Sequence, residues 1–162
     1  MEMMEHDYLK EVKYRPTKAE DRDFLYQLHV LTMKEYVDKT WGWDDAFQEA
    51  VFKKDFDPDE QKIITFDNQD IGVISVKHNE NEVFLRTIEI HPDFQRRGIG
   101  TFIIESLLNV GLQVNKPVML HVLKVNPAKK LYERLGFKAV TETPTHFVMK
   151  RRPPRWPNPG LG

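Results

Sequence analysis

The sequence predicts an α/β (α+β) fold in which about four helices flank one central, twisted, mixed but mostly antiparallel sheet of about seven strands. Two observations support this prediction. Apolar runs of strand-like composition alternate with stretches of helical periodicity along residues 1–150. In addition, a predicted helix lies between two neighbouring strands late in the chain, and such a crossover makes at least one strand pair parallel.

The N-terminal part is expected to form one strand and two helices. A short strand is predicted at residues 12–15. The first helix opens at a capping-box pattern, Thr17-x-x-Glu20, and carries apolar residues at roughly helical spacing: Phe24, Leu25, Leu28, Leu31 and Tyr36. The segment TWGWDD ends this helix, and Asp44 or Asp45 can cap a second helix through AFQEAVFKKDF.

Three strand-like runs follow, KIITF, IGVISVK and VFLRTIEI, and the turn signals DNQD and NEN between them predict an antiparallel meander. The next helix has an apolar face made of Ile99, Phe102, Ile103, Leu107 and Val110. The strand NKPVMLHVLKV precedes a short helix with Pro127 in its first turn and Gly136 at its C-terminal cap. KAVTE and HFVMKR then form a hairpin.

Composition excludes several classes of function. The chain has 162 residues, of which 40% are hydrophobic and 30% charged, as is usual for a globular protein, and we expect one domain over residues 1–150. No apolar run approaches the roughly 20 residues that span a bilayer, and the first residues lack the apolar core of a secretory signal. We therefore expect a cytoplasmic protein that binds no membrane. The absence of cysteine excludes disulfides, thiolate nucleophiles and cysteine-ligated zinc.

Residues 151–162 are predicted to form a basic, proline-rich tail, either mobile or loosely docked. Lys150, Arg151, Arg152 and Arg155 lie at this end of the chain, and without these four the remaining 20 basic residues face 25 acidic ones. The body therefore has a net charge of −5, and we expect no nucleic-acid partner. The closing hairpin and the tail are candidate dimer contacts, so that both a monomer and a homodimer stay open.

The stretch QRRGIG, residues 95–100, lies between an apolar strand and a helix. A helix N-terminus offers unpaired backbone N–H groups and the positive end of the helix dipole. Gly98 and Gly100 let a ligand approach this backbone, and Arg96 and Arg97 add charge suited to phosphate oxygens. The stretch is therefore either a diphosphate cradle or an ordinary turn with solvated arginines. A dinucleotide fingerprint and a P-loop are excluded, because neither a third glycine nor a Gly-Lys-Ser/Thr ending follows.

A second motif favours the cradle. QRRGIG matches the pyrophosphate-loop pattern Gln/Arg-x-x-Gly-x-Gly/Ala, and the later segment matches the motif that usually follows it through Asn126, Ala128, Leu131, Tyr132, Gly136 and Phe137. The chain resembles the GNAT superfamily of acyl-CoA-dependent N-acyltransferases. The resemblance covers residues 12–151 in element order and is specific over residues 85–137. It implies a GNAT-like fold and transfer of an acetyl group from acetyl-CoA to a primary amine, by direct attack in a ternary complex.

The resemblance also implies the cofactor-binding residues. The diphosphate of acetyl-CoA is expected on the backbone of Gln95, Arg96, Arg97, Gly98, Ile99, Gly100 and Thr101. The pantetheine arm is expected against Ile88, Glu89, Ile90, Asn126, Ala128 and Lys129, with the sulfur near Tyr132. A non-catalytic acyl-CoA-binding sensor or assembly module would keep these same residues and is the alternative function.

The reaction needs a base, because an alkylammonium with a pKa of about 10.4 is almost fully protonated at neutral pH. Glu89 is the best candidate; a water molecule and His91 are alternatives, and Glu89 can also be a plain solvent-facing residue. The resemblance implies the backbone N–H of Ile90 as oxyanion donor. Tyr132 is either the acid that protonates the departing thiolate or a core tyrosine with a solvated hydroxyl.

The acceptor, a small-molecule or peptide amine, is expected against the N-terminal helices. Trp41, Trp43 and Asp44 suit a cationic amine with an apolar body; the alternative is a helix corner with tryptophans packed inward and an aspartate cap. Arg86 either reaches this acceptor site or pairs with a carboxylate at the edge of the core. We expect His121 to be structural. The six histidines show no paired ligand spacing, and we expect no metal.

Overall fold

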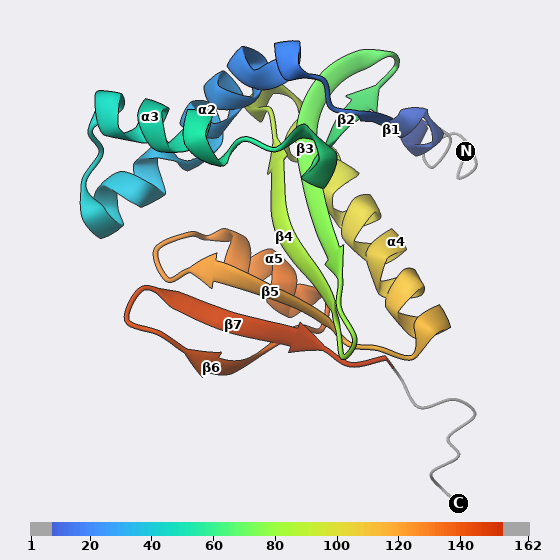
Figure 1. Cartoon of the computed structure of the whole chain (residues 1–162). Helices are drawn as coiled ribbons and strands as arrows, with labels where there is room; N and C mark the ends of the chain where they lie inside the picture. The colour runs from blue at the N-terminus through green and yellow to red at the C-terminus, as the bar shows by residue number, and fades with distance from the viewer. Residues whose placement is uncertain (1–7, 154–162) are drawn as a thin grey trace, which may run out of the picture. The chain divides into compact units, whose positions relative to one another are not determined.

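The structure is a computed structural model that describes residues 8–153. Within these residues, seven strands form one mixed sheet in the order β1-β2-β3-β4-β5-β7-β6, accompanied by four α-helices (Figure 1). The predicted fold class and the predicted order of elements are confirmed. The chain forms two compact units, the first with residues up to 76 and residues 87–100, the second with residues 77–86 and those from 101 onward.

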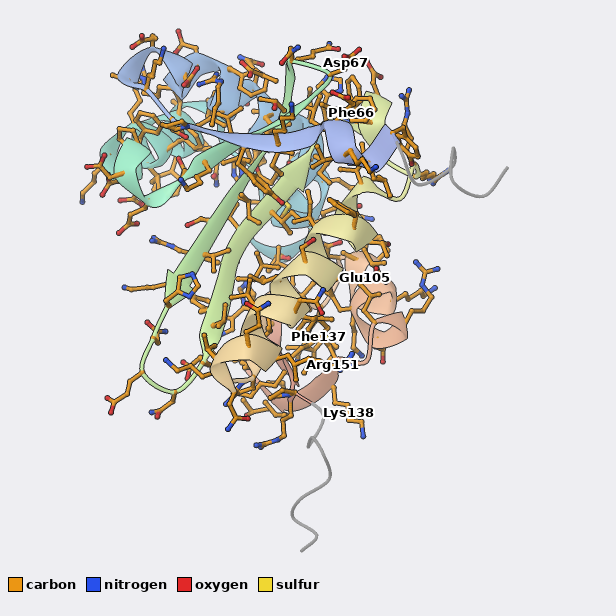
Figure 2. All side chains as sticks on the ribbon, turned by 90° about the vertical axis from the view of Figure 1, so that its right-hand side faces the viewer. Phe66, Asp67, Glu105, Phe137, Lys138 and Arg151 are labelled. Atoms are coloured by element: carbon orange, nitrogen blue, oxygen red, sulfur yellow. The ribbon has the colours of Figure 1, made fainter. Side chains whose placement is uncertain are left out.

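The first unit contains the N-terminal strands and two helices. β1 (Val12–Pro16) pairs antiparallel with β2 (Lys62–Phe66), which pairs antiparallel with β3 (Gln69–His78). The turn between β2 and β3 is formed by Asp67 and Asn68 (Figure 2 labels Asp67). α2 (Arg22–Trp41) and α3 (Asp45–Asp55) lie side by side (Figure 1). The apolar face of α2 packs against apolar residues of β2 and β3 in a buried cluster formed by Leu25, Leu28, Ile63 and Val73.

The entrance to α2 differs from the prediction. The hydroxyl of Thr17 is buried and donates to the carbonyl of Gln61 at 2.9 Å. The carboxylate of Asp21 instead accepts the backbone N–H of Lys18 at 2.8 Å and two guanidinium bonds from Arg15 at 2.9 Å each. The predicted capping box at Thr17 is therefore wrong. The buried hydroxyl of Thr17 needs a hydrogen-bond partner in the interior, and it finds one in Gln61. Asp21 caps the chain at Lys18 instead and is held by its charged hydrogen bonds with Arg15.

The second unit contains the predicted crossover. β4 (Val83–Ile90) pairs in parallel with β5 (Val118–Leu123) over its first three residues, and α4 (Ile99–Val114) connects the two strands. α5 (Ala128–Arg134) follows β5. β6 (Lys138–Glu142) and β7 (His146–Arg151) form the predicted hairpin, and β7 pairs antiparallel with β5. The buried side chains of this unit include Val83, Leu85, Ile103, Ile104, Val118, Leu120 and Met149.

The end of α5 is fixed by the last strand. Gly136 has a φ of 91°, as expected for the C-terminal cap of a helix. The guanidinium of Arg151, on β7, donates to the carbonyl of Leu135 at 2.6 Å (Figure 2 labels Arg151). Arg151 thus belongs to the sheet, and the rest of the predicted tail from residue 154 lies outside the described residues. No helix in the described part of the chain is both long and apolar enough to cross a bilayer.

Candidate active site

The loop between β4 and α4 turns its main chain toward solvent. Arg96 and Gly98 have φ values of 62° and 82°, so that the chain reverses sharply just before α4 begins. Gln95, Arg96, Arg97 and Gly98 are all exposed. The side-chain amide of Gln95 donates to the carbonyl of Ile90 at 2.8 Å and ties the loop to the end of β4. The first N–H groups of α4 have no partner within the helix and are available to an anion.

The space around the two loop glycines tests whether a diphosphate fits. A methyl group at Gly98 would meet only the hydroxyl of Tyr8, at 3.6 Å, and one at Gly100 only the side chain of Ile90, also at 3.6 Å. The protein itself therefore leaves room beside both residues. Gly98 is required by its positive φ, whereas neither packing nor a positive φ requires a glycine at position 100. A ligand that lies against the main chain accounts for the glycine at position 100, and the open side of Gly98 leaves room for the same ligand, so the loop fits the group.

Two side chains beside the loop, Arg97 and His91, have a defined contact. The guanidinium of Arg97 lies 5.1 Å from the centroid of the Phe94 ring, a cation–π contact that orients it. His91, an alternative base, accepts the backbone N–H of Asp93 at 3.1 Å and acts as the cap of the short turn before the loop. His91 is therefore a loop-capping residue in this structure.

The end of β4 presents Glu89 and Ile90 to opposite sides of the sheet, because successive strand residues alternate. The side chain of Ile90 lies beside Gly100 of the loop. The carboxylate of Glu89 instead reaches α2, where its Oε2 lies 2.9 Å from Nδ1 of His29. The side chain of Glu89 is only 10% exposed. The solvent-facing alternative for Glu89 is wrong, since the carboxylate is nearly buried and paired.

His29 is not among the site residues predicted from the sequence. It lies four residues after Leu25, on the side of α2 that faces the core. A titratable side chain on an apolar helix face is the only feature of the sequence that could have indicated a role for His29. Its ring centroid lies 6.1 Å from that of Trp43 and 5.8 Å from that of Phe52. Glu89 and His29 are 60 residues apart, so the pairing itself has no local signature.

Close packing fixes β4 beside β3 at this point. A methyl group on Gly72, in β3, would overlap the carbonyl of Glu89 and lie 3.3 Å from Cα of Ile90. Gly72 is buried, and its missing side chain lets the main chain of Glu89 approach. The position of Glu89 therefore depends on a glycine in the neighbouring strand.

The corner between α2 and α3 forms a groove of about 630 Å³, lined by Val37, Trp41, Gly42, Trp43, Asp44, Phe47, Gln48 and Val51. Trp41 is 61% exposed and does not pack inward. The indole N–H of Trp43 donates to Asp45 at 2.7 Å. Asp44 accepts the backbone N–H of Phe47 at 2.8 Å, which confirms the predicted helix cap. The corner is thus both a capped helix junction and an open aromatic surface.

In the second unit, the predicted cofactor residues gather at the start of α5. The side-chain oxygen of Asn126 accepts the backbone N–H of Ala128 at 2.9 Å, which leaves its amide hydrogens for another partner. The ammonium of Lys129 lies 4.1 Å from the centroid of the Phe147 ring. Both groups are therefore held in place by the fold.

Tyr132 is 9% exposed, and its ring packs edge-on against Phe137 with centroids 5.9 Å apart. Burial raises the pKa of the Tyr132 hydroxyl to about 12, because the charged phenolate is poorly solvated there. Among residues 8–153 no group forms a hydrogen bond with this hydroxyl. Tyr132 is thus a core side chain whose hydroxyl keeps its proton and remains a donor.

The two remaining candidates lie on strands of the second unit. Arg86 is exposed on β4. His121 is also exposed; its ring lies 5.1 Å from that of Phe84 and 6.5 Å from that of His146. The pKa of His146 is lowered by burial and by the nearby His121. In the described residues, no group of three or more His, Asp or Glu side chains is arranged to hold a metal ion.

The family is shown by comparison with known sequences. The model of the acetyltransferase (GNAT) family matches residues 23–137, and the chain belongs to this family of acyltransferases. A stretch of 58 residues is 41% identical to the cysteine-rich protein 2-binding proteins of mouse and human, and it covers 36% of this chain. The match spans only 7% of the length of these curated relatives.

Solved structures share the fold. The PaiA N-acetyltransferase of Thermoplasma acidophilum, in complex with coenzyme A, has a TM-score of 0.70 at 16% identity, over 87% of this chain and 98% of that one. Naa50 of Arabidopsis thaliana, in complex with the bisubstrate analogue CoA-Ac-MVNAL, has a TM-score of 0.59 at 15% identity, over 87% and 98% of the two chains. At these identities the similarity shows the fold alone.

Proposed function

We propose that this protein is an N-acetyltransferase that uses acetyl-CoA and acts on a primary amine. The observation that carries the proposal is the loop of residues 95–100, whose first four residues are exposed and which leaves room beside two glycines at the start of α4. Membership of the acetyltransferase family supports the same reaction. The coenzyme A bound to the PaiA enzyme, which has this fold, supports the choice of acetyl donor.

The proposed cofactor site uses main-chain groups first. The N–H groups from Arg96 to Thr101 bind the diphosphate, and the positive end of α4 adds to their attraction. The N–H of Gln95 does not take part, because it donates to the carbonyl of Pro92 at 3.2 Å. The main chain of Ile88–Ile90 binds the pantetheine arm, and Asn126, Ala128 and Lys129 contact it from the start of α5. When bound, acetyl-CoA supplies an acetyl group activated as a thioester. The N–H of Ile90 donates to the acetyl oxygen as negative charge develops on it.

Glu89 is the proposed base. An ammonium must lose one proton before its nitrogen has a lone pair to attack with, and a carboxylate within hydrogen-bond reach accepts that proton. The side chain of Glu89 points away from the loop side of β4, where Ile90 lies, and toward α2. The acceptor amine therefore comes from the side of α2 in this proposal.

Tyr132 is the proposed donor to the departing sulfur. Because burial raises its pKa to about 12, the hydroxyl stays protonated throughout the neutral range. A thiol has a pKa of about 8.5, so complete transfer of the proton to the thiolate is uphill by about 5 kcal/mol. A strong hydrogen bond with a partly shared proton is the contribution that this pKa supports.

The acceptor is proposed to be an amine with an apolar group. The groove at the α2–α3 corner exposes Trp41 and Phe47, and the carboxylates of Asp44 and Asp45 lie at the same corner. Aromatic rings and negative charge together attract a cation that carries apolar surface. The analogue bound to the Arabidopsis Naa50 joins coenzyme A to the peptide MVNAL, which begins with an apolar residue. A peptide with a free amino terminus therefore belongs among the acceptors to be tested.

The first experiment tests cofactor binding by thermal unfolding. Acetyl-CoA at about a hundred times its dissociation constant should raise the melting temperature by about 5–10 °C. Pantetheine, which lacks the diphosphate, serves as the control and should leave the melting temperature unchanged at the same concentration. No shift with acetyl-CoA would overturn the proposed site.

The second experiment tests catalysis by thiol release from acetyl-CoA. The acceptors are the peptide MVNAL, 2-phenylethylamine, free lysine and an aliphatic polyamine. Release with any of them supports the enzyme, with the apolar amines expected to react fastest. A thermal shift without thiol release from any acceptor would favour the non-catalytic acyl-CoA-binding module instead.

A further inference from the structure

The pairing of Glu89 with His29 limits the hydrogen-bond roles of both side chains when Glu89 acts as a base. An ionised carboxylate only accepts hydrogen bonds, so the contact of 2.9 Å between Oε2 and Nδ1 requires the hydrogen to be on Nδ1. Within residues 8–153, no other side chain forms a hydrogen bond with Glu89. Oε1 is therefore left for another partner, while Oε2 is held.

His29 is itself held by its neighbours. Its ring lies between Trp43 and Phe52, with interplanar angles of 37° and 32°. Its side chain is 26% exposed. Besides Glu89, two charged groups reach this cluster at Trp43: the ammonium of Lys34 is 5.8 Å from the ring centroid, and Asp45 accepts the indole N–H. The imidazole is thus fixed between α2, α3 and the end of β4.

This arrangement connects the proposed base to the proposed acceptor groove. Trp43 lines the groove and also contacts the His29 ring, and His29 bonds to Glu89. A glutamate has three rotatable bonds, so an unheld carboxylate spends little time in one orientation. A base must stay within hydrogen-bond reach of the proton that it removes.

We propose that His29 is a positioning residue that holds Glu89 in the orientation from which Oε1 takes the proton of the acceptor ammonium. The inference rests on the proposed N-acetyl transfer. In this step the nitrogen–hydrogen bond of the ammonium breaks, its electron pair stays on nitrogen, and the proton forms a bond to Oε1. The bond from Nδ1–H to Oε2 persists before and after the transfer, so His29 changes neither its charge nor its tautomer.

The test compares two substitutions of His29 in the full chain, by thiol release with the peptide MVNAL and with 2-phenylethylamine. His29→Leu removes the donor and should lower kcat by about tenfold or more. The acidic limb of its kcat/KM profile should move upward by about one pH unit, because the ionised carboxylate loses its hydrogen bond. His29→Asn places an amide N–H near the position of Nδ1–H and should keep kcat within about threefold.

Controls separate positioning from folding. Thr32→Val alters the same helix at a hydroxyl that bonds only to Leu28 of its own helix, and it should change neither kcat nor the pH profile. All variants should keep the thermal shift with acetyl-CoA; loss of that shift in His29→Leu would mean a structural role and overturn the inference.

The outcomes for the inference and for the proposed function are distinguishable. A wild-type rate and pH profile in His29→Leu would overturn the role of His29 and leave the proposed acetyl transfer standing. Equal losses of kcat in His29→Leu and His29→Asn would also contradict the role of His29, because the amide of asparagine should replace the Nδ1–H donor. Wild-type protein that releases no thiol with either acceptor would remove both proposals together.

Discussion

Tyr132 shows how burial sets the chemistry of one side chain. Its hydroxyl has a pKa of about 12, against about 10 for an exposed tyrosine. Between these two values the folded protein keeps a proton that the unfolded chain has lost. The contribution of Tyr132 to stability is therefore fully present below pH 10 and is lost as the pH rises through 12.

Replacing this hydroxyl should affect catalysis and alkaline stability separately. Tyr132→Phe should lower kcat by about tenfold to a hundredfold while the thermal shift with acetyl-CoA remains. Between pH 9 and 12, urea unfolding should show the wild type losing about 2 kcal/mol more stability than Tyr132→Phe. Unchanged turnover would remove Tyr132 from the reaction, and equal stability losses would contradict the raised pKa.

At the scale of elements, the loop before α4 combines two requirements in one turn. Gly98 adopts a positive φ, and its open side is where the proposed diphosphate lies. Gly42, at the end of α2, also has a positive φ, of 86°, and an added methyl would meet nothing within 4 Å. Gly42 therefore shares the backbone constraint of Gly98 without being part of the cofactor loop.

The matched pair Gly98→Ala and Gly42→Ala separates backbone strain from ligand contact. Each should destabilise the protein by about 1–3 kcal/mol, because alanine is strained at a positive φ. Only Gly98→Ala should weaken acetyl-CoA binding, by about tenfold or more in calorimetry. Equal affinities in both variants would argue against the diphosphate on this loop.

At the scale of the whole molecule, exposed apolar side chains are unevenly placed. Trp41 and Phe47, 61% and 63% exposed, meet in one groove. Leu31, on the same helix as Trp41, is 54% exposed and lies outside that groove. Single exposed leucines are common on proteins, whereas apolar residues that gather in a groove mark a binding surface.

This distribution predicts which surface change affects the acceptor. Trp41→Ala should raise the KM for 2-phenylethylamine by about tenfold, because apolar burial on binding is lost, and should leave kcat nearly unchanged. Leu31→Ala, a similar truncation on the same helix, is the control and should leave KM unchanged. Thiol-release kinetics measure both, and a matching effect of the two substitutions would exclude the groove as the acceptor site.

The sequence predicted those features that depend on local patterns. Hydrophobic periodicity, capping residues and turn residues predict α4, α5 and the hairpin of β6 and β7. The helical crossover predicts that β4 and β5 are parallel. The loop and the α5 motif are also contiguous in the chain. Local patterns do not predict pairs of residues that are far apart in the chain. Glu89 bonds to His29 because the end of β4 packs against α2, and Thr17 bonds to Gln61 because tertiary packing brings these two residues together. Side-chain partners that lie far apart in the chain produce no periodic pattern in the sequence.

The close approach at Gly72 limits how this scaffold can be redesigned. An engineer who wishes to change its amine preference can randomise the α2–α3 corner, where side chains end in open space. Position 72 should stay fixed in every such library, since any larger residue would push the backbone of Glu89 aside. Selectivity can therefore be evolved at the α2–α3 corner only while position 72, which lines no part of that corner, remains glycine.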